Sequence, residues 1–207
     1  MGTDVSFSIG LTGGVGCGKS TVANFLENAG LERLDTDKVA RELVEPDTKG
    51  HQSLMKAFGS SIFHADRTLN REALGSIIFS DSEQRRVLES ILHPLIWERV
   101  TSFQKHCRDR SINNIVEVPL LYENGRERAF SEVWVVTTSP ARQRDRLALR
   151  NNWTDEEITK RIASQMSLEE KARRADRVLE NNSNTDDLRE STLVALSETT
   201  NKFDLSK

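Results

Sequence analysis

The 207-residue sequence predicts an α/β fold in three layers, with a five-stranded parallel sheet at its centre. Short apolar runs alternate with helical segments along the chain, which is typical of parallel strands joined by right-handed crossovers. A glycine-rich loop lies between the first apolar run and the first helical segment. A helical block from residue 38 to about residue 107 is too long for one crossover. We expect it to form an insertion over the carboxyl ends of the strands, where ligands bind in such sheets.

Each strand of the predicted sheet is a short apolar run bounded by turn residues or helix signals. The strands are expected at residues 7–12, 31–37, 112–121, 132–138 and 175–181. Helices are expected between them, and several begin at a residue that can cap the first turn. The predicted caps are Asn70, Ser80 with Glu83, Ser139 before Pro140, Thr154 with Glu157, and Ser167 with Glu170.

The composition is that of a globular protein, with 36% hydrophobic and 29% charged residues. A net charge of -3 argues against a general nucleic-acid or membrane binder. The sequence contains no apolar run of membrane-spanning length and no signal-peptide pattern. Its two cysteines, Cys17 and Cys107, do not form a disulfide framework, so we expect a reducing, cytoplasmic setting.

The segment GGVGCGKS at residues 13–20, here called the phosphate loop, has the form G-x-x-x-x-G-K-S between a strand and a helix. Glycines let successive backbone N–H groups point at phosphate oxygens, and the following helix adds its positive end. In this motif the lysine reaches the β- and γ-phosphates and the serine hydroxyl ligates Mg²⁺. A glycine turn made only for tight packing would not explain the ordered Lys-Ser pair. We therefore predict nucleoside triphosphate binding by Gly14, Val15, Gly16, Cys17, Gly18, Lys19, Ser20 and Thr21, with Lys19 catalytic and Ser20 a metal ligand.

Two strings of a switch GTPase occur in the sequence, but neither has the required context. The D-x-x-G string at residues 47–50 follows a helical segment, and the N-K-x-D string at residues 201–204 lies in the C-terminal tail. Both strings would have to follow strands to build a guanine site. A nucleotide sensor without enzymatic activity is a further alternative, but it leaves the acceptor-side residues described below without a role.

A small-molecule kinase needs a carboxylate near the γ-phosphate, cations for the developing charge and a lid that excludes water. Asp35 and Asp37 end the second predicted strand, where they could hold Mg²⁺ through water and accept the proton of the acceptor hydroxyl. Alternatively, one of the pair caps the next helix, a role that Asp37 could fill. Glu117 ends the third strand and is either a second metal carboxylate or a solvated strand residue.

Arg142, Arg146 and Arg150 recur at every fourth position of one predicted helix and therefore share a face. Three like charges repel one another unless an anion neutralises them or solvent screens them. A solvated basic surface is the alternative to a phosphate site. Because the helix follows the fourth strand, where phosphate-loop kinases carry their lid, we expect Arg146 and Arg150 to contact phosphate, with Arg146 catalytic.

The chain resembles the dephospho-CoA kinases along nearly its whole length. The segments that carry the resemblance are IGLTGGVGCGKSTVANFLENAG, DTDKVARELVEPDTKG, LHPLIWERV, VEVPLLYENG, VWVVTTSPARQRDRL and ADRVLENN. The resemblance implies a phosphate-loop kinase core at residues 6–37, 112–141 and 175–201, a helical CoA-binding domain at 38–111 and a lid at 142–174. It also implies transfer of the ATP γ-phosphate to the ribose 3′-hydroxyl of dephospho-CoA, with Mg²⁺ as cofactor. We expect a monomer with no nucleic-acid or membrane partner.

The same resemblance implies roles for residues that the sequence alone does not assign to a substrate. Asp37 corresponds to the carboxylate usually taken as the base, and Asn181 falls in the adenine-side loop. The acceptor-side residues implied are Asp37, Arg41, His93, Pro119, Leu120 and Leu121. From the residues alone, His93 could be a packed helix residue and Arg41 could pair with Glu45.

The sequence departs from the family pattern at Cys17, where serine is usual. A thiol near a helix N-terminus can have a lowered pKa, so Cys17 is predicted to be an oxidation candidate. The segment ALRNN replaces the acidic residue that often follows the lid arginine, which leaves the role of Arg150 open. A kinase acting on a nucleoside or nucleoside monophosphate is the alternative activity.

Overall fold

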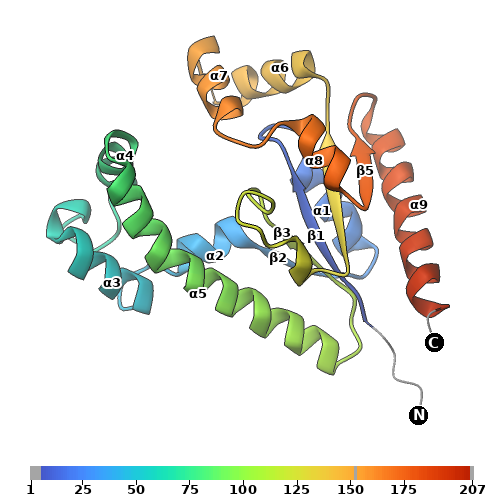
Figure 1. Cartoon of the computed structure of the whole chain (residues 1–207), viewed down its shortest axis with the longest axis horizontal. Coiled ribbons are helices and arrows are strands. Elements are labelled where there is room, and N and C mark those ends of the chain that lie inside the picture. The colour runs from blue at the N-terminus through green and yellow to red at the C-terminus, as the bar shows by residue number, and fades with distance from the viewer. Residues whose placement is uncertain (1–5, 152, 206–207) are drawn as a thin grey trace. The chain divides into compact units, whose positions relative to one another are not determined.

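The structure is a computed structural model that describes residues 6–151 and 153–205. The chain forms two compact units, which are coloured by residue number in Figure 1. The core unit comprises Met1–Leu34 and Gln104–Lys207, and the helical unit comprises Asp35–Phe103. Each unit has its own group of buried apolar side chains, so each is described by itself.

The predicted five-stranded parallel sheet is confirmed. The strand order is β2-β3-β1-β4-β5, and β1 lies at the centre, paired in parallel with β3 and β4. Gly10 of β1 could not carry a side chain without displacing Phe130 and Leu121. The strands are β1 Ser8–Gly13, β2 Glu32–Asp35, β3 Asn114–Glu117, β4 Glu132–Thr137 and β5 Arg177–Glu180.

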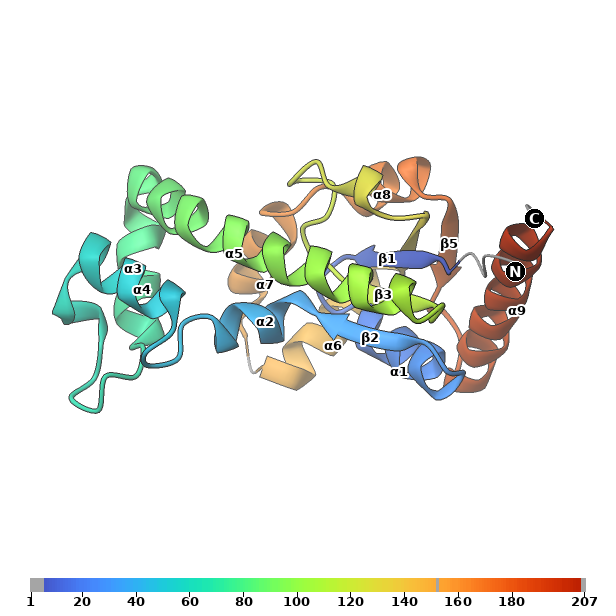
Figure 2. The same cartoon turned by 90° about the horizontal axis from the view of Figure 1, so that it is seen from below.

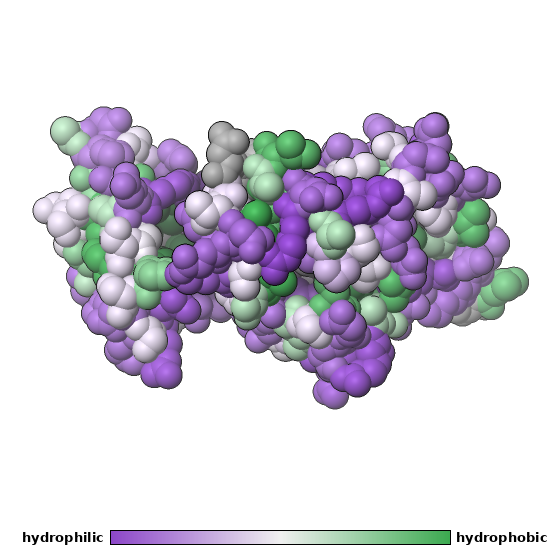
Figure 3. All heavy atoms as spheres, turned by 90° about the horizontal axis from the view of Figure 1, so that it is seen from above, coloured by the Kyte–Doolittle hydropathy of each residue, from purple (hydrophilic) through white to green (hydrophobic). Residues whose placement is uncertain are grey.

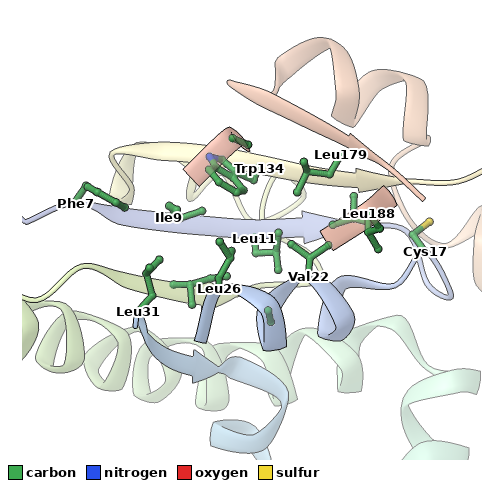
Figure 4. Packing of buried hydrophobic residues seen from close by; sticks show 14 residues of the cluster. Phe7, Ile9, Leu11, Cys17, Val22, Leu26, Leu31, Trp134, Leu179 and Leu188 are labelled. Atoms are coloured by element: carbon green, nitrogen blue, oxygen red, sulfur yellow. The ribbon is translucent and has the colours of Figure 1, made fainter. Parts of the chain in front are cut away.

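Helices cover both faces of this sheet, as the predicted layers require. The helices α1 (Lys19–Asn28) and α9 (Thr185–Asp204) contact each other, and Figure 2 shows α1 and α8 (Leu168–Arg174) on opposite sides of β1. Figure 4 shows Val22 and Leu26 of α1 directed toward Leu11 of β1. These three side chains have no exposed surface, so their burial is a main source of hydrophobic stabilisation.

Two more helices of the core unit, α6 (Pro140–Asn151) and α7 (Asp155–Ala163), contact each other. Arg144 of α6 forms an ion pair of 2.6 Å with Asp155 of α7. Thr154 and Glu157 form the predicted capping box of α7. The short 3₁₀ helix η2 (Glu127–Ala129) lies between β3 and β4 in the chain.

The helical unit is built from short helices around a separate apolar cluster of Val44, Leu54, Ile62 and Leu74. Asn70 accepts a hydrogen bond from the backbone N–H of Ala73, so the predicted cap of α4 is confirmed. Its elements are α2 (Thr36–Glu42), α3 (Lys49–Phe58), η1 (Ser60–Ile62), α4 (Arg71–Ser80) and the first part of α5 (Ser82–Asp109).

The predicted cap at Ser80 is wrong, because the helix before it extends through this residue. The Ser80 hydroxyl donates to the Ser76 carbonyl within α4. Asp81 caps α5 instead, since its Oδ1 accepts from the backbone N–H groups of Glu83 and Gln84 at 2.8 and 3.2 Å.

One GTPase-like string leads into a helix and the other ends a helix, and neither follows a strand, which removes the alternative built on them. Thr48 is the cap of α3 and Gly50 lies inside that helix. The N-K-x-D string forms the last turn of α9, where Lys202 donates to a sheet carboxylate. Among the described residues, no helix is both long and apolar enough to cross a membrane. The face drawn in Figure 3 is mostly hydrophilic, with small separate hydrophobic patches.

A buried carboxylate joins the sheet to its last helix. Glu132, the first residue of β4, is 2% exposed. Its Oε2 accepts from Trp134 Nε1, Thr199 Oγ1 and Arg177 Nε, and its Oε1 accepts from Lys202 Nζ at 2.8 Å. Burial acts to raise the pKa of this carboxyl group, but the four donors outweigh burial and lower the pKa to about 2.

We expect Glu132→Gln to lower the free energy of unfolding by about 3 kcal/mol at pH 7, since it leaves two buried donors, Trp134 and Thr199, and two basic side chains without a charged acceptor. A depressed pKa stabilises the fold above the unfolded-state value of 4.5, and this contribution is lost as the pH falls toward 2. Urea unfolding at pH 7 and at pH 3 measures both effects. The control is Glu198→Gln, whose carboxylate also pairs with Arg177 but is 61% exposed and should cost little. Equal losses in the two variants would contradict the argument.

Candidate active site

The phosphate loop follows β1 directly and leads into α1, as predicted from the spacing of its glycines. Gly13 and Gly18 have φ angles of 148° and 97°, which favour glycine. A Cβ at Gly13 would lie 2.3 Å from the Val136 carbonyl oxygen, and one at Gly18 would lie 2.3 Å from the Asn181 amide nitrogen. These two positions therefore need glycine because other backbone and side chains approach the loop closely.

The first turn of α1 has the properties of an anion site. Gly18 is the N-cap in a left-handed conformation, and glycine offers no side chain to the N–H groups of the first turn. The positive end of the helix dipole lies at the same place. Ser20 is exposed there and Thr21 is half-buried, so the Ser20 hydroxyl is open to a ligand.

The Lys19 ammonium group folds back over the loop. Its Nζ donates to the carbonyl oxygens of Gly13 at 3.2 Å and Gly14 at 3.0 Å. These carbonyl oxygens are neutral, whereas phosphate oxygens carry negative charge and attract an ammonium group more strongly. The ammonium group is therefore held beside the loop by partners that an anionic phosphate can replace.

Arg146 and Asn181 meet at the phosphate loop, although they lie far apart in the sequence. The Asn181 side-chain nitrogen donates to the Cys17 carbonyl at 2.9 Å. Arg146 Nη2 donates to the Asn181 side-chain oxygen at 3.0 Å, and Arg146 Nη1 lies 3.5 Å from the Cys17 carbonyl. Both predicted nucleotide-site residues thus contact the turn that precedes α1, and the arginine is held there by the asparagine.

Two glutamines that the sequence did not single out also bind this loop. Gln143 is 4% exposed and donates to the Val15 carbonyl at 2.7 Å. Gln165 accepts from the Val15 backbone N–H at 3.0 Å. The peptide groups on both sides of Val15 are therefore held by the segments that form α6 and follow α7. The sequence offered one signal for Gln143, since it lies four residues before Leu147 on a helix rich in arginine, and Leu147 is also buried.

The other arginines of α6 differ in position from Arg146. Arg142 is exposed and its Nη1 donates to the Ser183 carbonyl at 3.3 Å. Arg144 pairs with Asp155 on α7. The side chain of Arg150 lies outside the described residues, so its predicted phosphate contact stays a prediction.

The predicted lowering of the Cys17 pKa is wrong. The thiol has no exposed surface, and burial raises its pKa although Lys19 and Arg146 act in the opposite direction. A thiol with a raised pKa forms little thiolate, which is the reactive species. Cys17 is therefore a packing residue of the phosphate loop, and its oxidation is not favoured.

Asp35, and not Asp37, caps α2. Its Oδ1 accepts from the backbone N–H groups of Asp37 at 2.8 Å and Lys38 at 3.3 Å. The proposed capping role of Asp37 is therefore wrong, and its exposed carboxylate lies in the first turn of α2. Asp37 belongs to the helical unit together with Arg41, which is exposed, and His93, which is half-buried in α5.

Glu117 ends β3 beside Leu11 of β1 and is 4% exposed. Arg33 binds it through Nε at 2.7 Å and through Nη2 at 2.6 Å to the same oxygen, Oε1. Arg33 also pairs with Glu27 of α1. The carboxylate that was expected near the metal is thus a partner of an arginine.

The predicted acceptor turn follows β3 in the core unit. The Pro119 carbonyl accepts from the Thr12 hydroxyl, two residues before Gly14, at 3.2 Å. Leu120 is 39% exposed, whereas Leu121 has no exposed surface. The turn is therefore joined to the strand that leads into the phosphate loop, and one of its leucines is open to a ligand.

A parallel sheet, a phosphate loop between β1 and α1 and an arginine from the helix after β4 together define the class of phosphate-loop kinases. The family model described as dephospho-CoA kinase matches residues 7–187. The chain therefore belongs to the dephospho-CoA kinase family, and it is an ATP-using kinase of coenzyme A biosynthesis.

Individual relatives agree with this assignment. A dephospho-CoA kinase of Symbiobacterium thermophilum is 42% identical over 182 residues, which cover 86% of this chain and 75% of that protein. A solved structure from Thermus thermophilus has a TM-score of 0.80 at 32% identity and covers 93% of this chain and 97% of that one. A dephospho-CoA kinase structure from Campylobacter jejuni has a TM-score of 0.73 at 23% identity, covers 96% and 99% of the two chains, and shows the same fold.

We expect both cysteines of the folded protein to react slowly with a thiol reagent or mild peroxide. Cys17 is buried with a raised pKa, and burial beside Glu32 raises the pKa of Cys107 to about 11. Thiol titration in buffer and in denaturant, followed by activity measurement, tests this expectation. Rapid loss of activity in buffer that is absent from Cys17→Ser would contradict it.

Proposed function

We propose that the chain transfers the γ-phosphoryl group of ATP to the ribose 3′-hydroxyl of dephospho-CoA, which gives ADP and coenzyme A as the final step of coenzyme A synthesis. The observation that carries this proposal is the convergence of Lys19, Arg146 and Asn181 on the phosphate loop in a member of this family. Free cysteines, both buried, support a reducing cytoplasmic setting.

On the donor side, the backbone of the phosphate loop from Gly14 to Thr21 would cradle the phosphates of ATP. Lys19 would exchange its carbonyl partners for phosphate oxygens, and Arg146 would stabilise charge that develops during transfer. Asn181 holds Arg146 in place for this role and borders the nucleotide. Arg150 is a further phosphate ligand in the proposal, and the lid at residues 142–174 would exclude water.

The residues at the start of α1 fit a magnesium ion that arrives with ATP. Ser20 is exposed and supplies a hard oxygen, and Mg²⁺ is usually held by one or two protein groups together with substrate phosphates. Among the described residues, no group of three or more histidine, cysteine or carboxylate side chains could hold a metal by itself. Bound there, Mg²⁺ would neutralise phosphate charge. The capping bonds of Asp35 and the Arg33 partner of Glu117 make a water-mediated role the better assignment for both carboxylates.

On the acceptor side, Asp37 is the proposed base. A ribose hydroxyl is a poor nucleophile until a carboxylate accepts its proton or aligns it. Arg41 and His93 of the proposed CoA-binding domain at residues 38–111, with the turn Pro119, Leu120 and Leu121, would bind dephospho-CoA. The two substrates in this proposal, ATP and dephospho-CoA, require neither an oligomer nor a membrane, and we propose a monomer.

We expect the purified chain to convert ATP and dephospho-CoA to ADP and coenzyme A, and chelation of Mg²⁺ to stop the reaction. Lys19→Ala is the matched control, because loss of one preorganised charge contact should lower turnover by about 10²-fold or more. A coupled assay of ADP release, run with a panel of nucleosides and nucleoside monophosphates as other acceptors, measures both. Turnover of such an acceptor without dephospho-CoA turnover would overturn the proposal.

We expect Asp37→Asn to fold normally, to bind dephospho-CoA within a few-fold of wild type and to lose roughly 10²–10⁴ in turnover, the range for removal of a general base. The matched control is Asp35→Asn, because asparagine caps a helix almost as well as aspartate. Thermal unfolding and steady-state kinetics of both variants decide the assignment. Full activity in Asp37→Asn with loss in Asp35→Asn would show that the other carboxylate is the base.

A further inference from the structure

Lys171 of α8 is a fully buried charge that has no role in the mechanism above. Its side chain is 0% exposed. Lysine is almost never fully buried unless it is paired, because the ammonium group loses its hydration. Its partners therefore indicate what the buried charge holds in place.

Both partners of Lys171 lie on the turn that follows β3. The ammonium group donates to the Pro119 carbonyl at 3.0 Å and pairs with Glu123 Oε1 at 2.9 Å. The same Glu123 oxygen accepts from the backbone N–H of Met166 at 2.9 Å. The segment from Met166 to Lys171 is thus bonded to the turn at both of its ends.

The Pro119 carbonyl is also bonded from its other side. It accepts from Thr12 Oγ1 at 3.2 Å, and Thr12 has no exposed surface. A carbonyl oxygen has two lone pairs, so two donors from different elements fix the orientation of the peptide between Pro119 and Leu120. The proline ring fixes φ on the preceding side. Directly after this peptide, Leu120 is partly exposed and Leu121 is buried.

The same short segment also reaches the phosphate loop. Gln165, one residue before Met166, accepts from the Val15 backbone N–H. Residues 165–171 therefore contact the donor side through Val15 and the turn through Pro119 and Glu123. An apolar residue at position 171 would fill the same volume at a lower desolvation cost, but it would fix no carbonyl direction.

We propose that Lys171, together with Glu123, is a positioning residue that holds the Pro119–Leu121 turn in register with the phosphate loop for binding of the acceptor. Lys171 acts through the Pro119 carbonyl and does not touch either substrate. The inference rests on the proposed function, in which this turn contacts dephospho-CoA. Thr12 of β1 is the second donor to the Pro119 carbonyl, so it holds the turn in place relative to β1.

The test is steady-state kinetics of Lys171→Met, which keeps the length of the side chain and removes its charge. We expect KM for dephospho-CoA to rise about 10-fold or more, within the ~10²-fold that a misplacement of ~1 Å can cost. KM for ATP should stay within about twofold, since the contacts of Lys19 and Arg146 are unchanged. The matched control is Arg173→Met, which removes an exposed charge from the same helix and should change neither value.

Two further variants keep the test decisive if Lys171→Met does not fold. Thr12→Val removes the second donor to Pro119 at nearly constant volume, and Glu123→Gln removes the charge that faces Lys171. Both should raise KM for dephospho-CoA selectively, and Thr12→Val combined with Lys171→Met should cost less than the product of the single effects. A lowered melting temperature with unchanged KM in these variants would overturn the positioning role. Absence of dephospho-CoA turnover in wild type would instead overturn the proposed function and, with it, this inference.

Discussion

The hydrogen bond from Asn181 to the Cys17 carbonyl fixes the turn from which the candidate site is built. It crosses from the segment after β5 to the loop before α1, two parts of the chain separated by more than 160 positions. The approach leaves no space for a Cβ at Gly18. Asn181 can therefore reach the Cys17 carbonyl only because residue 18 is glycine. Arg146 binds both the Asn181 side-chain oxygen and the Cys17 carbonyl, so its position depends on the same contact.

The helix α6 contributes more to the loop than its arginines. Gln143 and Arg146 lie three positions apart and both reach the loop, one at Val15 and the other at Cys17. A movement of α6 would therefore change the loop backbone and the arginine together.

The sequence predicted those features that depend on neighbours in the chain. The phosphate loop, the Asn70 cap and the Thr154 capping box are short patterns, and each was found as predicted. The choice between Asp35 and Asp37 as a cap depends on where β2 ends, which the sequence pattern defines only within one or two residues. The roles assigned to Asp37, Arg41 and His93 came from family resemblance, and they stay predictions.

Features that depend on tertiary packing could not be predicted. Burial raises the pKa of Cys17, and the apolar cluster that buries it includes Leu179 of β5 and Leu188 of α9, which follow it by more than 160 residues. Lys171 lies in LEEKARR, a segment that reads as a solvated helix, and its burial follows only from packing of α8 against β4. A local pattern contains no information about which face of such a short charged helix will be covered.

Two of the buried charges of the core unit, Glu132 and Lys171, lie at opposite ends of the sheet. Glu132 is the first residue of β4 and binds α9, whereas Lys171 binds the turn that follows the end of β3. A buried charge needs several donors or acceptors in fixed directions, so it orients what it touches more strictly than an apolar contact does. At the amino ends of the strands, the fixed contacts of Glu132 stabilise the fold. At the carboxyl ends, the contacts of Lys171 fix the turn that follows β3.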